Sequence, residues 1–161
     1  MATQTIALAM ITFLHDLFTA AWIGGLITLG LTVMPATKKI LGKTPETKKV
    51  MDLIQKRHSV IVYTSIIGLT LTGLLQANRS SLFLGLFSFG NTYSAVLTIK
   101  HVLVIAMIII ALYRSLALAK TSSPTQEKLK KILMLLNIIF GISILLLSGF
   151  ATALSASIPA L

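Results

Sequence analysis

The sequence predicts an all-α, polytopic membrane protein in which four transmembrane helices form an up-down bundle. The 161 residues are 55% hydrophobic and only 11% charged, with a mean hydropathy of +0.92, whereas about a quarter of the residues in soluble domains are charged. Four apolar stretches are also long enough to cross about 30 Å of hydrocarbon as helices. They run over residues 6–35, 59–77, 92–119 and 132–158. We therefore expect a single transmembrane domain over residues 1–161.

The first stretch has no Lys or Arg before it and is too long for the apolar core of a cleavable signal, so we expect it to remain as the first helix. This helix is expected to end at Met34-Pro35, because proline fixes φ and lacks an N–H. In the connection that follows, Val50, Leu53 and Ile54 have helical spacing and predict a short surface helix.

The second and fourth stretches contain small residues, such as Gly68 and Gly141, that allow membrane helices to approach closely. Thr70 and Thr72 are expected to hydrogen-bond within their own helix. Between the second and third stretches, residues 82–90 are apolar and rich in phenylalanine but too short to span. We interpret this segment as an interfacial or partly re-entrant lid on the outer face.

The basic residues predict the orientation in the membrane. Twelve of the fourteen Lys and Arg lie around the first and third connections, and only Arg79 and Lys100 lie toward the other side. The twelve are Lys38, Lys39, Lys43, Lys48, Lys49, Lys56, Arg57, Arg114, Lys120, Lys128, Lys130 and Lys131. By the positive-inside rule, both basic connections are cytoplasmic and both termini lie outside the cytoplasm, in the plasma membrane. The net charge of +10 thus predicts a lipid bilayer with anionic headgroups as the partner, and no nucleic acid.

Ionisable residues inside spans are costly and by default mark a functional site. The first stretch holds His15 and Asp16, the third holds Lys100 and His101, and His58 opens the second. His15 comes nine residues after the start of its stretch and His101 nine residues after the start of the parallel one, so both fall in one layer of the outer leaflet. If the two imidazoles face one another, Asp16 and Lys100 lie on the same side of the histidine pair, where they are expected to form an ion pair.

Two facing imidazoles are suitable axial ligands for a haem iron. Arg79 and Lys100 are placed to meet the propionates. The absence of cysteine excludes thiolate copper sites, iron–sulfur clusters and disulfides. The same histidines are also suitable for copper, with Met10 or Met107 as thioether ligands. Met10 lies off the face of His15, which favours haem.

Two readings without a cofactor stay open, namely a buried polar network that fixes helix register and a proton relay. For His58, a solvated interfacial position is favoured over a role as a metal ligand. Trp22 follows His15 by seven residues and shares its face, so it packs against a cofactor or against another helix.

The residues of the first half resemble a known family. The order His15, Trp22-Ile23-Gly24-Gly25 and Met34-Pro35 resembles the W-x-G-G…P helix of CopD-type copper-resistance domains. A similar order follows in Leu71-Thr72-Gly73-Leu74-Leu75-Gln76-Ala77, Asn91-Thr92-Tyr93, Ile99-Lys100-His101 and Arg114. The resemblance covers about Leu14 to Arg114 and implies a four-helix membrane domain linked to copper uptake or resistance. CopD domains are often halves of larger transporters, so copper transport by this chain implies a homodimer or another partner.

The chain is also similar to the related HemJ-type protoporphyrinogen oxidases, which bind b-type haem. His15 and Lys100 match the first-helix histidine and the third-helix lysine of that family. Thr32-Val33-Met34-Pro35 stands where that family has an arginine-bearing P-R-L segment, so the resemblance does not extend to porphyrinogen oxidation.

Together these observations predict a membrane protein that binds haem b through His15 and His101. It would serve electron transfer or haem-linked redox chemistry with a membrane or extracytoplasmic redox partner. An electron-transfer or binding protein is favoured over a haem-dependent oxidoreductase. The alternative is a CopD-type protein that binds or transports a copper ion.

Overall fold

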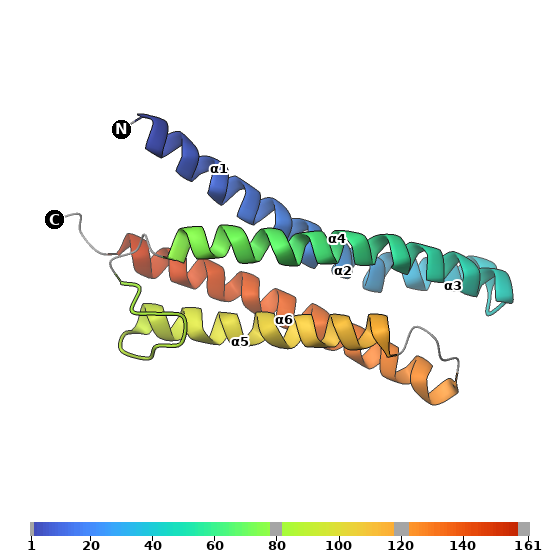
Figure 1. The fold of residues 1–161 in the computed structure, drawn as a ribbon. Coiled ribbons are helices and arrows are strands. Elements are labelled where there is room, and N and C mark those ends of the chain that lie inside the picture. The colour runs from blue at the N-terminus through green and yellow to red at the C-terminus, as the bar shows by residue number, and fades with distance from the viewer. Residues whose placement is uncertain (1, 78–81, 118–122, 158–161) are drawn as a thin grey trace. The chain divides into compact units, whose positions relative to one another are not determined.

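The computed structural model describes residues 2–77, 82–117 and 123–157. Within these ranges no strand occurs, and four helices are long and apolar enough to cross a membrane. The predicted all-α fold with four spans is therefore confirmed, and the chain is a multi-pass membrane protein (Figure 1). The chain divides into two compact units, unit 1 (residues 1–72) and unit 2 (residues 73–161), and each unit is described separately.

The first span is one continuous helix that alternates between α-helical and π-helical segments. The run consists of α1 (Ala2–Thr19), a π segment (Ala20–Gly24), α2 (Gly25–Thr28), a second π segment (Leu29–Val33) and α3 (Met34–Leu41). The prediction that this helix ends at Met34-Pro35 is wrong. Pro35 lies in the first turn of α3, immediately after a π segment. The hydrogen-bond ladder is already widened there, so the missing N–H and the bulk of the ring are tolerated.

A tight turn joins α3 to α4 (Pro45–Ala77). Gly42 follows the last residue of α3 with a φ of 66°, which glycine adopts without the steric cost of a side chain. Thr47 is buried, and its hydroxyl donates to the carbonyl of Leu41 at 3.0 Å. The backbone N–H of Thr47 in turn donates to the Thr44 hydroxyl at 3.2 Å. These bonds satisfy groups that the two helix ends leave unpaired.

The predicted surface helix and the second span are one continuous helix. α4 begins at Pro45 and not near Ser59, where the apolar stretch begins. The intervening residues include Lys56 and Arg57, which are good helix formers, and no Gly or Pro follows Pro45 before Gly68. Nothing therefore stops the helix at the edge of its apolar part.

Three contacts show that α4 runs antiparallel to the first span within unit 1. His15 contacts Thr72. A Cβ added at Gly68 would overlap the ring of Phe18, and one added at Gly25 would lie 2.7 Å from Nε2 of His58. The partners on α4 thus occur in the reverse order of those on the first span. Glycine at both positions permits this close approach.

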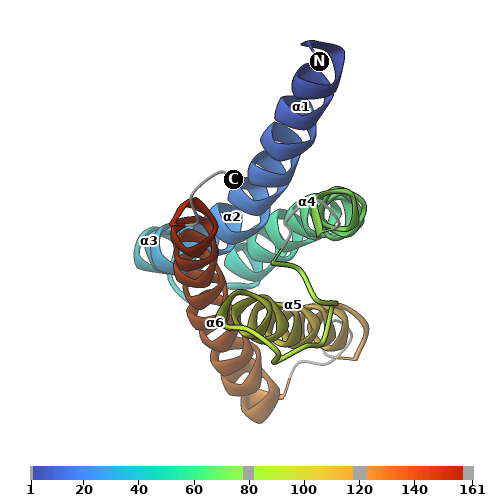
Figure 2. The ribbon, with the colours of Figure 1, turned by 90° about the vertical axis from the view of Figure 1, so that its left-hand side faces the viewer.

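Unit 2 contains α5 (Thr92–Leu116) and α6 (Pro124–Ala156), which lie side by side and run antiparallel (Figures 1 and 2). α5 begins at a capping residue, Asn91, whose side-chain oxygen accepts from the backbone N–H of Ser94 at 2.7 Å. The described part of α5 ends at Leu116, and the predicted end at Ala119 lies outside the described residues.

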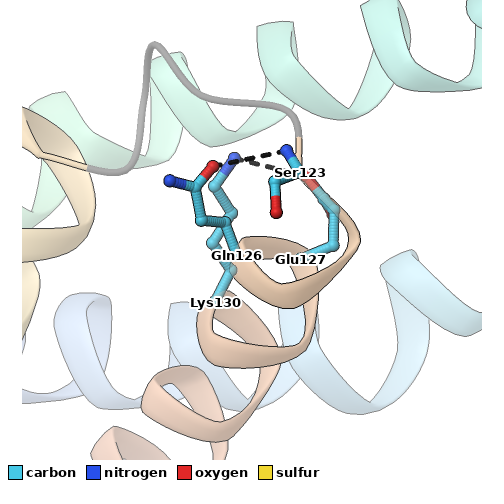
Figure 3. A network of polar contacts seen from close by, with 4 residues as sticks. All are labelled: Ser123, Gln126, Glu127 and Lys130. Carbon is cyan, nitrogen blue, oxygen red and sulfur yellow. Dashed lines mark hydrogen bonds and ion pairs between the residues drawn. The ribbon is translucent and has the colours of Figure 1, made fainter.

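α6 begins eight residues before the predicted Ile132. At its start, Gln126 Oε1 accepts from the backbone N–H of Ser123 at 3.3 Å, and Lys130 pairs with Glu127 at 3.3 Å (Figure 3). This capping and the proline in the first turn start the helix among polar residues, before the apolar stretch begins. Further along, a buried stripe continues at helical spacing through Met134, Asn137, Ile138, Gly141, Ile144 and Ala151.

Candidate functional site

The imidazole of His15 is held by a hydrogen bond from one helix to the next. His15 lies on α1 in unit 1, and its Nδ1 is 2.9 Å from the hydroxyl oxygen of Thr72 on α4. The Thr72 hydroxyl donates to the carbonyl of Gly68, one turn earlier on its own helix, at 2.7 Å. The expectation that Thr72 hydrogen-bonds within its own helix is therefore confirmed, but the same hydroxyl also bonds His15.

This geometry favours one tautomer of His15. A hydroxyl has a single hydrogen to donate, and the Thr72 hydroxyl directs it to Gly68. The bond to His15 must then have Nδ1–H as the donor and the hydroxyl oxygen as the acceptor. We infer that the neutral imidazole carries its hydrogen on Nδ1 and its lone pair on Nε2. Histidines that bind metals commonly show this arrangement, with the other ring N–H given to a neighbouring acceptor.

Trp22 lies in the first π segment and is only 2% exposed. Its Nε1 is buried and has no hydrogen-bond partner among the described residues. Buried indole N–H groups usually find an acceptor, and π segments occur often at functional sites. The structure thus places an unsatisfied donor within the first span, seven residues after His15.

His58, for which the sequence favoured a solvated interfacial position, packs against another helix. It is half-buried on α4, and its ring lies against Gly25 of the first span. The neighbouring charges of Lys56 and Arg57 suggested exposure, but both of these residues lie on the exposed side of the helix. The absence of a side chain at Gly25 leaves the space into which the imidazole turns.

Asp16, by contrast, is exposed on α1. Its predicted ion pair with Lys100 joins the two units and stays a prediction, as does the predicted facing of His15 and His101. Lys100 is half-buried on α5. Arg79, predicted to meet a propionate, lies outside the described residues.

His101 lies in unit 2, half-buried on α5 and covered by the lid segment, which comprises residues 82–90. The centroid of the Phe87 ring is 6.4 Å from that of His101, with the ring planes tilted by 58°. The backbone of Leu86 also lies beside this imidazole. The Nδ1 atom of His101 is buried and has no hydrogen-bond partner within the part of the chain that the structure describes.

The lid segment is fastened to the same face of α5. Ser94, Thr98 and His101 recur at helical spacing along this face, and the first two are 0% and 3% exposed. The backbone N–H of Leu84 donates to the Ser94 hydroxyl at 3.0 Å. The N–H of Ser88 donates to the Thr98 hydroxyl at 2.9 Å, and that hydroxyl donates to the Ser88 carbonyl at 3.0 Å. The segment is non-helical and packed on α5, and its predicted interfacial or re-entrant position stays a prediction.

Sequence reasoning did not single out the buried polar residues Ser94, Thr98 and Asn137. The helical spacing of Ser94 and Thr98 from His101 was a readable signal. Asn137, 1% exposed in α6, interrupts an otherwise apolar run. Its side-chain oxygen finds no hydrogen-bond donor in the described ranges. No sequence spacing indicates the bond between Thr72 and His15, which are 57 residues apart.

The ligand chemistry available in this chain is imidazole. Among the residues that the structure describes, no group of three or more His, Cys, Asp or Glu side chains is arranged to hold a metal ion. Met10 is 53% exposed on α1, whereas Met107 is fully buried on α5.

Comparison of the chain with protein-family models, with curated proteins and with solved structures finds no match.

Proposed function

We propose that this chain is a membrane protein that binds haem b through His15 and His101 and serves electron transfer. The observation that carries the proposal is the hydrogen-bonded order His15, Thr72, Gly68 carbonyl. It orients the imidazole and favours the hydrogen on Nδ1, as in histidines that bind a metal. When bound, the haem supplies a one-electron couple.

The donor set fits a b-type haem. Imidazoles on two spans meet the need for two axial ligands, and cysteine ligands are absent from the chain. Trp22 adds a buried N–H donor that has no acceptor among the described residues. We assign Lys100 and Arg79 to the propionates and Asp16 to charge balance at the same end of the spans. His58 contacts the first span at Gly25, which is ten residues after His15. It is not a ligand in this proposal.

The charge distribution supports the orientation. With the basic connections in the cytoplasm, both termini and the His15 layer face outside the plasma membrane. A redox partner in the membrane or on the extracytoplasmic side would then exchange electrons at that end. A homodimer is compatible with the extensive apolar surface of the spans. The copper alternative finds no specific support, because Met10 and Met107 differ so widely in exposure.

The test is the absorption spectrum of the purified, haem-supplemented protein, with a reduced-minus-oxidised difference and metal analysis. We expect sharp α and Soret bands that are lost in His15→Ala and in His101→Ala. The matched control is His58→Ala, which removes the third histidine of the chain and should keep the bands. A colourless protein loaded with copper, or bands that survive both ligand substitutions, would overturn the proposal.

A further inference from the structure

The lid segment exposes an unusual amount of apolar surface for a loop. It contains no charged residue. Leu84, Leu86, Phe87 and Phe89 are 56%, 41%, 63% and 73% exposed. Gly85 has a φ of 138°, which favours glycine and allows the segment to fold back. In water, these neighbouring side chains would form a costly apolar patch.

Several backbone groups of the lid segment are bonded by side chains of α5 and of its capping residue Asn91. Its N–H groups at Leu84 and Ser88 donate to the hydroxyls of Ser94 and Thr98. The carbonyl of Leu82 accepts from both Asn91 Nδ2, at 2.8 Å, and the Ser94 hydroxyl, at 2.9 Å. Non-helical backbone is tolerated at membrane depth only where protein groups replace water as partners. The side chains of α5 meet this condition for these groups.

The position of these bonds along α5 gives the depth. The 25 residues of α5 extend about 37 Å, some 7 Å more than a hydrocarbon layer of about 30 Å. If the helix is centred, its first residue lies about 3–4 Å outside that layer. Thr98 comes six residues later, about 9 Å along the axis, and thus about 5 Å inside the hydrocarbon. The Phe87 ring reaches further along the helix, to His101.

We propose that the lid segment is a re-entrant loop whose outward side chains lie among the acyl chains of the bilayer. The acyl chains are the fitting occupant because the apolar surface is continuous with that of α5, a membrane span with exposed Ile99 and Val102 at this level. The loop shields the ring of His101 from water on this side. This proposal does not depend on haem, so its failure would leave the proposed function untouched.

The chain contains no cysteine, so single nitroxide spin labels can be attached to the full-length protein without removing a native site. Labels at Leu84→Cys and Phe89→Cys, in phosphatidylcholine vesicles, are tested by electron paramagnetic resonance for collision with oxygen, which concentrates in lipid, and with a water-soluble nickel chelate. We expect oxygen to relax both labels more strongly than the chelate does. Both positions are exposed, so the substitutions should not disturb folding.

Two controls bracket this result. A label at Ile109→Cys, 61% exposed in the interior of α5, reports the response of a lipid-facing position. A label at Lys49→Cys, exposed in the basic part of α4, reports the response in water. Lid labels that behave like the Lys49 control would overturn the proposal. Labels shielded from both reagents would also overturn it, because a protein surface and not lipid would then cover the loop.

Discussion

The two units place a histidine in a membrane span in different ways. In unit 1, the His15 ring is held through Nδ1 by a threonine of the neighbouring helix, and that threonine is in turn fixed by its own backbone. In unit 2, the threonine and serine on the His101 face bond the lid segment instead, and the ring is covered by Phe87. His15 is thus held by a side chain of the neighbouring helix, whereas His101 lies between the Phe87 ring and the backbone of Leu86. We expect one tautomer at His15.

The largest effect should come from the close helix contact beside the His15 bond. Gly68→Ala puts a methyl group into the ring of Phe18, and the overpacking should cost about 2–3 kcal/mol of stability. Thermal unfolding of the detergent-solubilised protein measures this loss. Gly24→Ala is the matched control, because a Cβ there meets nothing within 4 Å. It should be neutral or slightly stabilising. Equal losses in the two variants would refute close packing at Gly68.

The next effect should appear in unit 2. Thr98→Val removes a hydroxyl that bonds both the N–H and the carbonyl of Ser88. Two lost bonds cost about 1–2 kcal/mol locally. Hydrogen exchange of the Ser88 amide should then be on the order of tenfold faster. Thr92→Val, at the exposed start of α5, serves as the control. Unchanged protection of Ser88 in Thr98→Val would mean that the hydroxyl does not hold the lid segment.

A smaller effect is expected from Thr72→Val, which removes the bond to His15 but keeps the shape of the side chain. Stability should fall by about 1 kcal/mol. Nitrogen-15 NMR of the imidazole should show that the hydrogen is no longer confined to Nδ1. If haem is bound, its affinity should fall by about 10–100-fold. Thr70→Val is the control, since that hydroxyl donates to the carbonyl of Ile66 on its own helix. An unchanged tautomer signal in Thr72→Val would contradict the arrangement.

The smallest effect should come from the surface ion pair at the start of α6 (Figure 3). Glu127 is about half exposed, so water and salt screen its attraction to Lys130. Lys130→Ala should change the free energy of unfolding by about 0.3 kcal/mol. Lys128→Ala, at an exposed neighbouring position, controls for the loss of charge alone. A loss above about 1 kcal/mol would show that the ion pair is not weakened by solvent as expected.

Composition and apolar length predicted the four spans, because a membrane imposes both on any chain that crosses it. The ends of the helices were harder to predict. Apolar length marks where the hydrocarbon stops, whereas the helix stops only at a residue that breaks it. α4 therefore continues back to Pro45, and α6 to Pro124. Pro35 failed as a stop signal because an adjacent π segment accommodates it, and such segments leave no clear sequence pattern.

The candidate site was predictable where it depends on residue type and depth. His15, His101 and Trp22 were singled out as candidates because ionisable or large aromatic residues are uncommon deep in a span. The partners were harder to find. The bond to Thr72 depends on the register of two antiparallel helices, and the position of His58 depends on the missing side chain at Gly25. Both are facts of packing that spacing along one helix does not contain.

The two π segments also make the length of the first span adjustable. A turn closed by a bond to the fifth residue contains one residue more than an α turn, so each segment holds a spare residue. Deleting Ala21 should let the first segment rewind as regular α-helix while the residues on either side keep their present faces. The same deletion at Ile11, within regular α-helix, would rotate the preceding residues by about 100°. The span can thus be shortened by one residue at two defined places without losing the alignment between its ends.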